Sequence, residues 1–324
     1  ENNNRKYSDF CEVLESPLVK EAVQRFGGTN AISEIKSLAY SGYGNKSHHI
    51  LDLSFESGAS VLSLVRNILD FNTERIIKIK KGIDIHLVGE AKKEVRKYEP
   101  QLFALKPQDF IGVVPKLHVA EGDEVKVGTV LFHDKKNEGI FFTSPVSGKV
   151  KAIVRGEKRV ILQVVIESDG KYEAIDFGKA EPSKLSRNEV IEKLVQSGTW
   201  TMLRQRPYST IANPQDEPKC IAVSLFDTAP MAPDNNFIIK DQMTAIKAGV
   251  EALAKLTKGM VYLNVNSSET KQALASLNFS AKNITITEFE GPHPAGNIST
   301  QLNVLSPINK GETVWYTYAQ NLIA

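Results

Sequence analysis

The chain has 324 residues, of which 41% are hydrophobic and 24% are charged, and its formal net charge is +2. These values are ordinary for a globular protein of two or three domains, and they exclude a strongly basic nucleic-acid-binding protein. The two cysteines, Cys11 and Cys220, have no cysteine neighbours, so an iron–sulfur or zinc site is not expected. No stretch approaches the roughly 20 apolar residues that span a bilayer, so no transmembrane segment is predicted.

Residues 1–76 have a helical pattern. Val19, Val23 and Phe26 recur at helical spacing, and the pair Gly27-Gly28 that follows them would end the helix. Nothing in this segment specifies chemistry. We expect a small helical segment of unknown origin.

The pattern changes near Ile76, and residues 77–168 are rich in short strands. "VAEGDEVKVGTVLF" (119–132) and "FTSPVSGKVKAIVRGEKRVI" (142–161) alternate apolar and polar residues and turn at glycines. The two phrases resemble the biotinyl/lipoyl-like fold, the barrel-sandwich hybrid. We therefore expect residues 77–168 to form a biotinyl/lipoyl-like β domain, topologically separate from the segment that follows.

This resemblance raises the hypothesis of a prosthetic-group carrier. Lipoyl and biotinyl carriers hold their modified lysine on the hairpin tip between the two phrases, where this chain has Lys135 and Lys136. The carriers continue directly into a hydrophobic strand, whereas Asn137-Glu138-Gly139 intervenes here. We expect a longer, polar tip that a modifying enzyme would not recognise. The alternative to a carrier is that both lysines are solvated loop charges.

Residues 169–324 are predicted to form a Rossmann-like α/β domain. Helical stretches alternate with apolar strands, and this alternation is typical of a parallel sheet. One helix is marked by a stripe at helical spacing, in which Met243, Ile246, Val250, Leu253 and Leu256 recur. The expected elements are a helix over 189–195, a strand over 221–226, a helix over 241–257, a strand over 261–265, a helix over 271–277 and a strand over 284–289.

Several long motifs in a fixed order carry a family resemblance. They are "IKIKKGIDIHLVGEA", "FIGVVPKLHVAEGDEVKVGTVLF", "FTSPVSGKVKAIVRGEKRVILQVVI", "SGTWTMLRQRPYSTIANP", "FDTAPMAPD" and "FEGPHPAGN". Together they resemble the A subunit of the bacterial Na+-translocating NADH:quinone oxidoreductase over about residues 77–324. The family pattern begins near "IKIKKG" and continues past "QNLIA". Residues 1–76 therefore have no counterpart, and we expect the α/β domain to be truncated at its C-terminal side.

The resemblance implies a peripheral subunit on the cytoplasmic face of the bacterial inner membrane. The complex reduces ubiquinone with NADH and exports sodium, and it uses NADH, FAD, FMN, riboflavin and an iron–sulfur cluster. The α/β domain also resembles the flavoprotein component of respiratory complex I, where a glycine-rich loop approaches the flavin phosphate. In the corresponding stretch, 197–207, only Gly198 is a glycine, and Trp200, Met202 and Leu203 would fill the flavin space. We therefore expect no catalytic residue, metal or bound cofactor in this chain.

Two loops are the main candidates for a binding site. "GPHPAGN" (291–297) places His293 between Pro292 and Pro294 directly after an apolar strand, and "FDTAPMAPD" (226–234) follows another strand. If both strands are parallel, their carboxyl ends meet at one edge of the sheet, where ligands tend to bind. His293 could contact a quinone carbonyl. Alternatively, the loop could dock on the membrane-embedded B subunit or be purely structural.

Arg204 and Arg206 form the second candidate. Arginines two positions apart share one face of a strand. They could bind an anionic lipid, a phosphate or the carboxylates of a partner, or they could form a salt-bridged surface pair. For the whole chain, the leading hypothesis is a component of a redox complex that binds quinone or docks on the B subunit. A structural adaptor and a carrier remain the alternatives.

Overall fold

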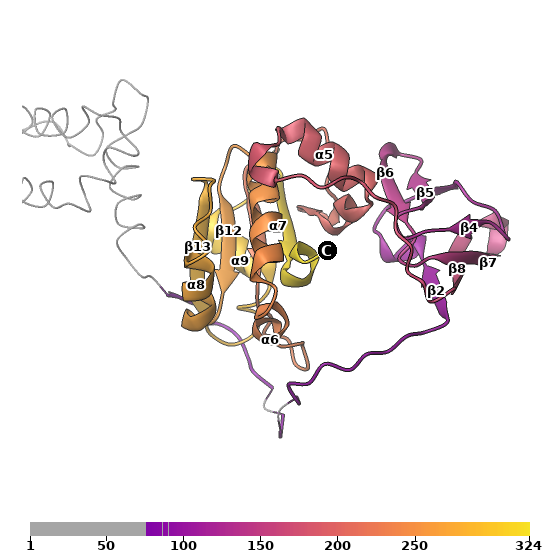
Figure 1. Cartoon of the computed structure of the whole chain (residues 1–324). Helices are drawn as coiled ribbons and strands as arrows, with labels where there is room; N and C mark the ends of the chain where they lie inside the picture. Colours follow the sequence, from indigo (N-terminus) through magenta and orange to yellow (C-terminus); the bar gives the residue numbers. More distant parts are fainter. Residues whose placement is uncertain (1–75, 86, 90) are drawn as a thin grey trace, which may run out of the picture. The chain divides into compact units, whose positions relative to one another are not determined.

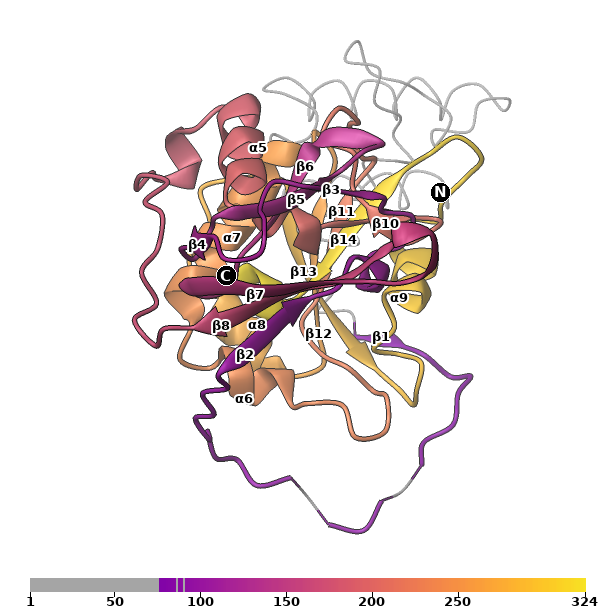
Figure 2. The same ribbon diagram turned by 90° about the vertical axis from the view of Figure 1, so that its right-hand side faces the viewer.

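The computed structural model describes residues 76–85, 87–89 and 91–324, shown in two views in Figures 1 and 2. The helical segment predicted for residues 1–76 lies outside the described residues, except for Ile76. The described part contains two sets of strands, an antiparallel β domain and a mixed α/β sheet.

The β domain consists of two antiparallel sheets that share a core. One sheet has the order β2-β8-β7-β4 and the other β3-β5-β6. Alternate residues point inward, so that Val164 and Ile166 of β8 are buried, and the rings of Phe132 and Phe142 stack 4.6 Å apart in the other sheet. The predicted barrel-sandwich arrangement is confirmed. The strands are β2 (Leu102–Leu105), β3 (Pro115–Leu117), β4 (Glu124–Val125), β5 (Val130–Asp134), β6 (Asn137–Thr143), β7 (Gly148–Arg155) and β8 (Ile161–Ser168).

The α/β domain is built on a seven-stranded sheet with the order β1-β13-β12-β11-β14-β9-β10. Its first five strands in this order are parallel, whereas β9 runs antiparallel to β14 and β10 antiparallel to β9. The expected parallel sheet is therefore a mixed sheet, in which β9 is the one strand that runs against the others. The strands are β1 (Ile77–Lys78), β9 (Arg204–Arg206), β10 (Thr210–Ile211), β11 (Ile221–Ser224), β12 (Val261–Val265), β13 (Ile284–Glu290) and β14 (Val314–Tyr318).

Helices cover both faces of this sheet. Ile221 and Val223 of β11 lie in one buried cluster with the apolar stripe of α7, while Ala222 lies in another cluster with Ile298 and Leu302 of α9. Successive residues of a strand point to opposite faces, so α7 and α9 pack on opposite sides. The helices are α5 (Arg187–Gln196), α6 (Asn235–Ile239), α7 (Met243–Leu256), α8 (Ser268–Ala275) and α9 (Ile298–Leu305), and 3₁₀ turns include η2 (Pro107–Asp109), η5 (Thr199–Met202) and η6 (Ala319–Leu322).

Two expectations about the β domain need correction. Ile77 and Lys78, which the sequence groups with that domain, form β1 and pair with Phe289 and Glu290 of β13. The alternating pattern "IIKIKKG" predicts a strand but does not specify its partner. The hairpin tip is also shorter than expected. Asp134 pairs with Asn137, so Lys135 and Lys136 alone form the turn, and the polar residues 137–139 belong to β6.

Candidate functional site

The two loops predicted at the carboxyl edge of the sheet meet in the structure. The loop of residues 226–234 follows β11, and the loop of residues 291–297 follows β13. Thr228 joins them, because its hydroxyl lies 3.2 Å from Nδ1 of His293 and accepts a hydrogen bond from the backbone nitrogen of Gly296 at 2.9 Å. A Cβ atom at Gly296 would lie 2.5 Å from the backbone nitrogen of Thr228. Glycine at this position therefore permits the close approach of the two loops.

The segment that follows β1 holds the other side of the 291–297 loop. The backbone nitrogen of His293 donates to the Asp84 carboxylate at 2.9 Å, and its carbonyl accepts from the backbone nitrogen of Ile83 at 3.0 Å. Gly82 lies so close that a Cβ atom there would collide with the His293 carbonyl. His293 is thus half-buried between two segments that are distant in the sequence. The peptide bond between His293 and Pro294 is cis.

A buried network of hydrogen bonds also holds the loop of residues 291–297. The amide of Gln301 on α9 donates to the Ala295 carbonyl at 3.1 Å and to the Ser224 hydroxyl at 3.0 Å, and its oxygen accepts from Asn264 at 2.8 Å. The Asn297 side chain caps α9 by accepting from the backbone nitrogen of Ser299. Hydrogen bonds therefore fix the loop at several points along its backbone, and its shape is set before any partner arrives.

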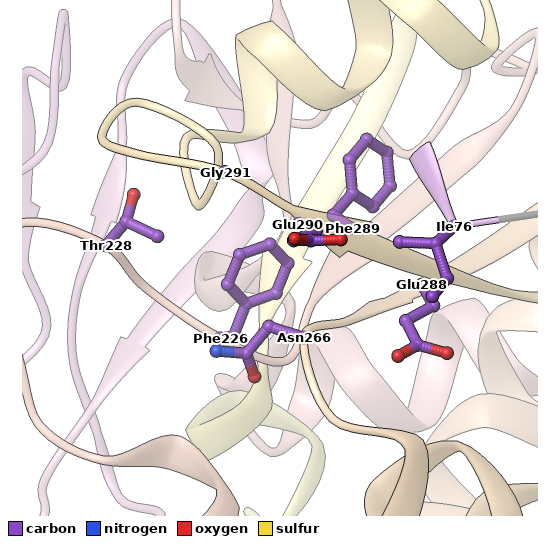
Figure 3. Close-up of a pocket in the computed structure, with 8 residues that line it drawn as sticks. All are labelled: Ile76, Phe226, Thr228, Asn266, Glu288, Phe289, Glu290 and Gly291. Carbon is purple, nitrogen blue, oxygen red and sulfur yellow. The ribbon is translucent and has the colours of Figure 1, made fainter. Parts of the chain in front are cut away.

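A pocket of about 240 Å³ lies beside these loops at the carboxyl edge (Figure 3). We call it the edge pocket. Its two carboxylates have partners, since Glu288 accepts from the Ser268 hydroxyl at 2.9 Å and Glu290 lies 3.0 Å from the Lys78 ammonium. Thr228 and Gly291 belong to its wall, whereas His293, Pro292 and Pro294 do not. The lining residues are Ile76, Phe226, Thr228, Asn266, Glu288, Phe289, Glu290 and Gly291.

Arg204 and Arg206 share one face of β9, as predicted, but the salt-bridge interpretation is wrong. Neither arginine forms an ion pair within the part of the chain that the structure describes. The Arg204 guanidinium lies 5.5 Å from the ring centre of Phe110, and that of Arg206 lies 4.9 Å from the ring of Tyr316. Aromatic faces attract guanidinium groups without neutralising them. The buried Nε of Arg206 also has no hydrogen-bond partner among the described residues.

A larger cavity of about 630 Å³ lies between the β domain and the α/β domain, and we call it the inter-domain cavity. Its walls come from Phe110, the strand ends of the β domain, the segment 174–177, the stretch 197–204 and the end of β14. Arg204 and Tyr318 both line this cavity. Tyr318 lies on β14, two residues after Tyr316, which pairs with Arg204 across the sheet. Partial burial raises the pKa of the Tyr318 phenol, which is protonated at neutral pH in any case and can donate a hydrogen bond.

The sequence pattern indicates Arg204 as a candidate but gives no sign of this cavity. Its lining residues come from separate stretches between Leu105 and Asn321, and no local pattern connects them. Of the residues expected to fill a flavin site, Trp200 and Leu203 are buried in the core, while Met202 is exposed and lines the cavity. The one sequence feature that points to this site is the spacing of Arg204 and Arg206 in a stretch that has no carboxylates.

The remaining predicted sites have simple surroundings. At the hairpin tip, Lys135 is exposed and Lys136 donates a hydrogen bond to the Gly112 carbonyl at 3.0 Å. The amide of the neighbouring Asn137 lies 3.4 Å from the Asn213 side chain. Within residues 76–324, apart from positions 86 and 90, no group of three or more potential metal ligands occurs. In the same part of the chain, no helix has both the length and the apolar character needed to cross a membrane.

Comparisons with known proteins agree with this architecture. A family model described as the NqrA N-terminal barrel-sandwich hybrid domain matches residues 77–169, and one described as the NqrA second alpha/beta domain matches residues 185–324. The A subunit of the Na(+)-translocating NADH-quinone reductase of Photorhabdus laumondii is 39% identical over 254 residues, which are 77% of this chain and 55% of that protein. The same component from Neisseria gonorrhoeae is 40% identical over 256 residues, again 77% and 55% of the two chains.

A third relative gives the same result, because the corresponding protein of Serratia proteamaculans is 39% identical over 256 residues, 77% of this chain and 56% of that protein. The chain thus spans about half the length of the curated relatives that it matches. Both family models match in the order in which the two domains occur in the structure. Through residues 77–324, this chain belongs to the NqrA family, the A subunit of the Na(+)-translocating NADH-quinone reductase.

Proposed function

We propose that this chain is a peripheral component of a Na+-pumping NADH:quinone reductase, on the cytoplasmic face of the membrane. In this proposal it supports quinone reduction and sodium export by presenting a rigid surface rather than by chemistry of its own. The relatives are named as the A subunit of such an enzyme. The fixed 291–297 loop is the observation in the structure that best supports the proposal.

The surroundings of His293 favour a contact role over a catalytic one. Its ring has the Thr228 hydroxyl as a neighbour, and the carboxylate of Asp84 engages its backbone nitrogen instead of the ring. General acid–base catalysis by histidine usually relies on a group that orients the ring and stabilises its charge. Pro292 and Pro294 restrict the backbone, so little conformational freedom is lost on binding. The loop would contact quinone or the membrane-embedded B subunit through its shape.

The cofactor part of the proposal is that other subunits carry the flavins. Trp200 and Leu203 lie in the hydrophobic core, in the stretch that would approach a flavin in a complex I-like flavoprotein. A purified chain should therefore lack the visible absorbance of a flavin. A structural adaptor that never contacts quinone is the main alternative. The carrier hypothesis is less favoured, because Lys136 is held on the domain surface and the tip lies close to Asn213.

Co-expression with the remaining subunits of the complex tests this proposal. The tagged chain should co-purify with the B subunit and support NADH:quinone reductase activity. His293→Gln keeps a hydrogen-bonding side chain but cannot titrate, so turnover should remain within about twofold of the wild type. Replacing Pro292 and Pro294 by alanine should weaken assembly or raise the apparent KM for quinone.

Two results would count against this proposal. If the wild-type chain fails to co-purify with any other component of the reductase, its assignment to the complex is wrong. If His293→Gln abolishes turnover while assembly and quinone affinity are unchanged, the histidine carries out proton chemistry. Photo-crosslinking with a quinone analogue separates quinone contact from the adaptor alternative, because an adaptor would leave only the B subunit labelled.

A further inference from the structure

The inter-domain cavity has few free hydrogen-bonding groups despite several polar side chains in its wall. Thr143 donates to the Ser197 carbonyl, Ser144 to the Val146 carbonyl and Thr201 to the Gly198 carbonyl, at 2.7 to 3.1 Å. Thr199 is likewise engaged, and the Asn321 amide donates to the Thr317 hydroxyl at 3.0 Å. Most of the polar wall therefore bonds to the protein itself and offers little to a ligand.

Arg204 and Tyr318 are the two exceptions. Among the described residues, the only hydrogen bond from the Arg204 guanidinium is a long one, 3.4 Å, to the Ser209 carbonyl, although the group has five donors. The Tyr318 phenol has no hydrogen-bond partner in the same part of the chain and packs edge-on against Tyr316. Both groups come from neighbouring strands, β9 and β14. Both line the cavity, and Arg204 has no ion pair among the described residues, although the charges of Arg206 and Asp227 also act on Tyr318.

The rest of the cavity is apolar and is supplied mainly by the β domain and the segment after it. A cavity of about 630 Å³ is well within the range of small-molecule sites, about 300–1,000 Å³. None of the described residues that line it carries a carboxylate, so nothing in this wall repels an anion or pairs with Arg204. The apolar side chains that line the cavity include Leu105, Phe110, Val127, Phe142, Ile175 and Phe177.

From this arrangement we infer that the inter-domain cavity binds a single-chain anionic amphiphile. An oxygen-bearing head, a carboxylate or a phosphate, accepts hydrogen bonds from Arg204 and Tyr318, and the acyl chain lies against the apolar wall of the β domain. Such a ligand contacts both domains at once and couples them. The site is distinct from the edge pocket and from the loop of residues 291–297, and the inference does not depend on assembly into the reductase.

The distribution of donors favours this ligand over a flavin or a quinone. A flavin ring carries nitrogen and oxygen atoms along its edges, and burying these atoms without partners is costly. The engaged hydroxyls of the wall cannot supply those partners. A neutral quinone would leave the Arg204 charge uncompensated in an apolar cavity, whereas a carboxylate or a phosphate neutralises it.

Isothermal titration calorimetry on the full chain tests the inference with three probes of equal chain length. Dodecanoate represents a free fatty acid, lauroyl-lysophosphatidic acid represents a lipid headgroup, and dodecanol is the neutral control. We expect at least one of the two anions to bind tenfold or more tightly than dodecanol. The anion that binds more tightly identifies the source of the ligand, either a free fatty acid or a lipid headgroup.

Three variants make the test specific. Arg204→Gln should weaken anion binding at least tenfold, as expected for the loss of a charged hydrogen-bond donor, and should leave dodecanol binding unchanged. Arg206→Gln is the matched control, because Arg206 has the same side chain on the same strand but does not line the cavity, and it should bind as the wild type does. Ile175→Asp places a charge in the apolar wall and should weaken all three probes.

The inference is overturned if the folded chain binds neither anion, or if dodecanol binds as tightly as the anions. Equal losses in Arg204→Gln and Arg206→Gln would also overturn it, because the effect would then not be local. Displacement of dodecanoate by equimolar FMN or decylubiquinone would identify a different occupant. Circular dichroism spectra and thermal melts of each variant distinguish lost binding from lost folding.

Discussion

The two hollows of this chain are built in opposite ways. The edge pocket is small and lies within one domain, and its carboxylates already have partners. The inter-domain cavity is larger and lies between two domains, and its arginine has no carboxylate partner among the described residues. The loops beside the edge pocket are fixed by many hydrogen bonds. The cavity keeps two donors free. The first arrangement suits a docking surface of fixed shape, and the second suits a site that awaits a charged ligand.

The largest effect should come from the hydrogen bonds of Gln301, which hold the 291–297 loop beside the edge pocket. Gln301→Leu leaves Asn264, Ser224 and the Ala295 carbonyl without this partner in a buried place. Ser224 keeps its hydrogen bonds to the carbonyls of Phe226 and Gly296, so two buried groups lose a partner. At about 1–3 kcal/mol for each, the free energy of unfolding should fall by about 2–6 kcal/mol. Urea unfolding measures this change. Asn303→Leu, at an exposed position on the same helix, is the control and should change stability little. Equal losses in both variants would show that the network does not stabilise the loop.

A smaller effect should appear at the wall of the inter-domain cavity. Gly198 has a φ of 81°, and a Cβ atom there would collide with the Thr143 side chain from the β domain. Gly198→Ala should therefore lower the free energy of unfolding by about 2–3 kcal/mol, because it combines backbone strain of about 1–2 kcal/mol with a packing clash. Gly170→Ala is the matched control, since Gly170 has a φ of 71° and nothing within 4 Å of the added atom. If both variants lose the same stability, the two domains do not pack closely at Gly198.

The smallest effect should be a pH dependence confined to the β domain. His133 is buried, and Nδ1 of its ring lies 2.6 Å from Nε2 of His118. Burial, and after it His118 and Lys116, lowers the pKa of His133 below its ordinary value of 6.5. The unfolded chain therefore binds a proton more readily, so stability is full above about pH 6.5 and falls as the pH drops below it.

Thermal melts between about pH 7.5 and about pH 5 test this dependence. His133→Gln removes the titrating group, so its melting temperature should fall less steeply with acidification than that of the wild type. Identical slopes for the two proteins would show that His133 does not cause the loss. The stability of the α/β domain, which holds the edge pocket, should not change over this pH range. Calorimetry or limited proteolysis that follows the unfolding of each domain separately can check this.

Features of the fold that repeat locally are predictable from the sequence. The stripe on α7 and the apolar strands β11, β12 and β13 lie close to their predicted ranges, because their periodicity is set by burial. The meeting of the two loops follows from the general rule for parallel strand ends, and it is confirmed by the contact between Thr228 and His293.

Features that depend on distant partners are not predictable in the same way. β9 and β10 are very short and polar, so they lack a strand pattern, and their place at the sheet edge depends on β14. The partners of Arg204 and Arg206 are aromatic rings from elsewhere in the chain. The two-residue turn at Lys135 and Lys136 cannot be predicted from the sequence, because the first residues of β6 are polar and have the composition of a loop.

The pairing of β1 with β13 has a consequence for the order in which the chain acquires its structure. Ile77 leaves the ribosome more than two hundred residues before its partner Phe289, whereas each strand of the β domain finds its partners within about 65 residues. Local pairings close faster than distant ones, and domains fold as units during synthesis. The β domain is therefore expected to form first, as an insertion within a sheet that is still incomplete. The outermost strand β1 is made first, and it can pair only after β13 has been made.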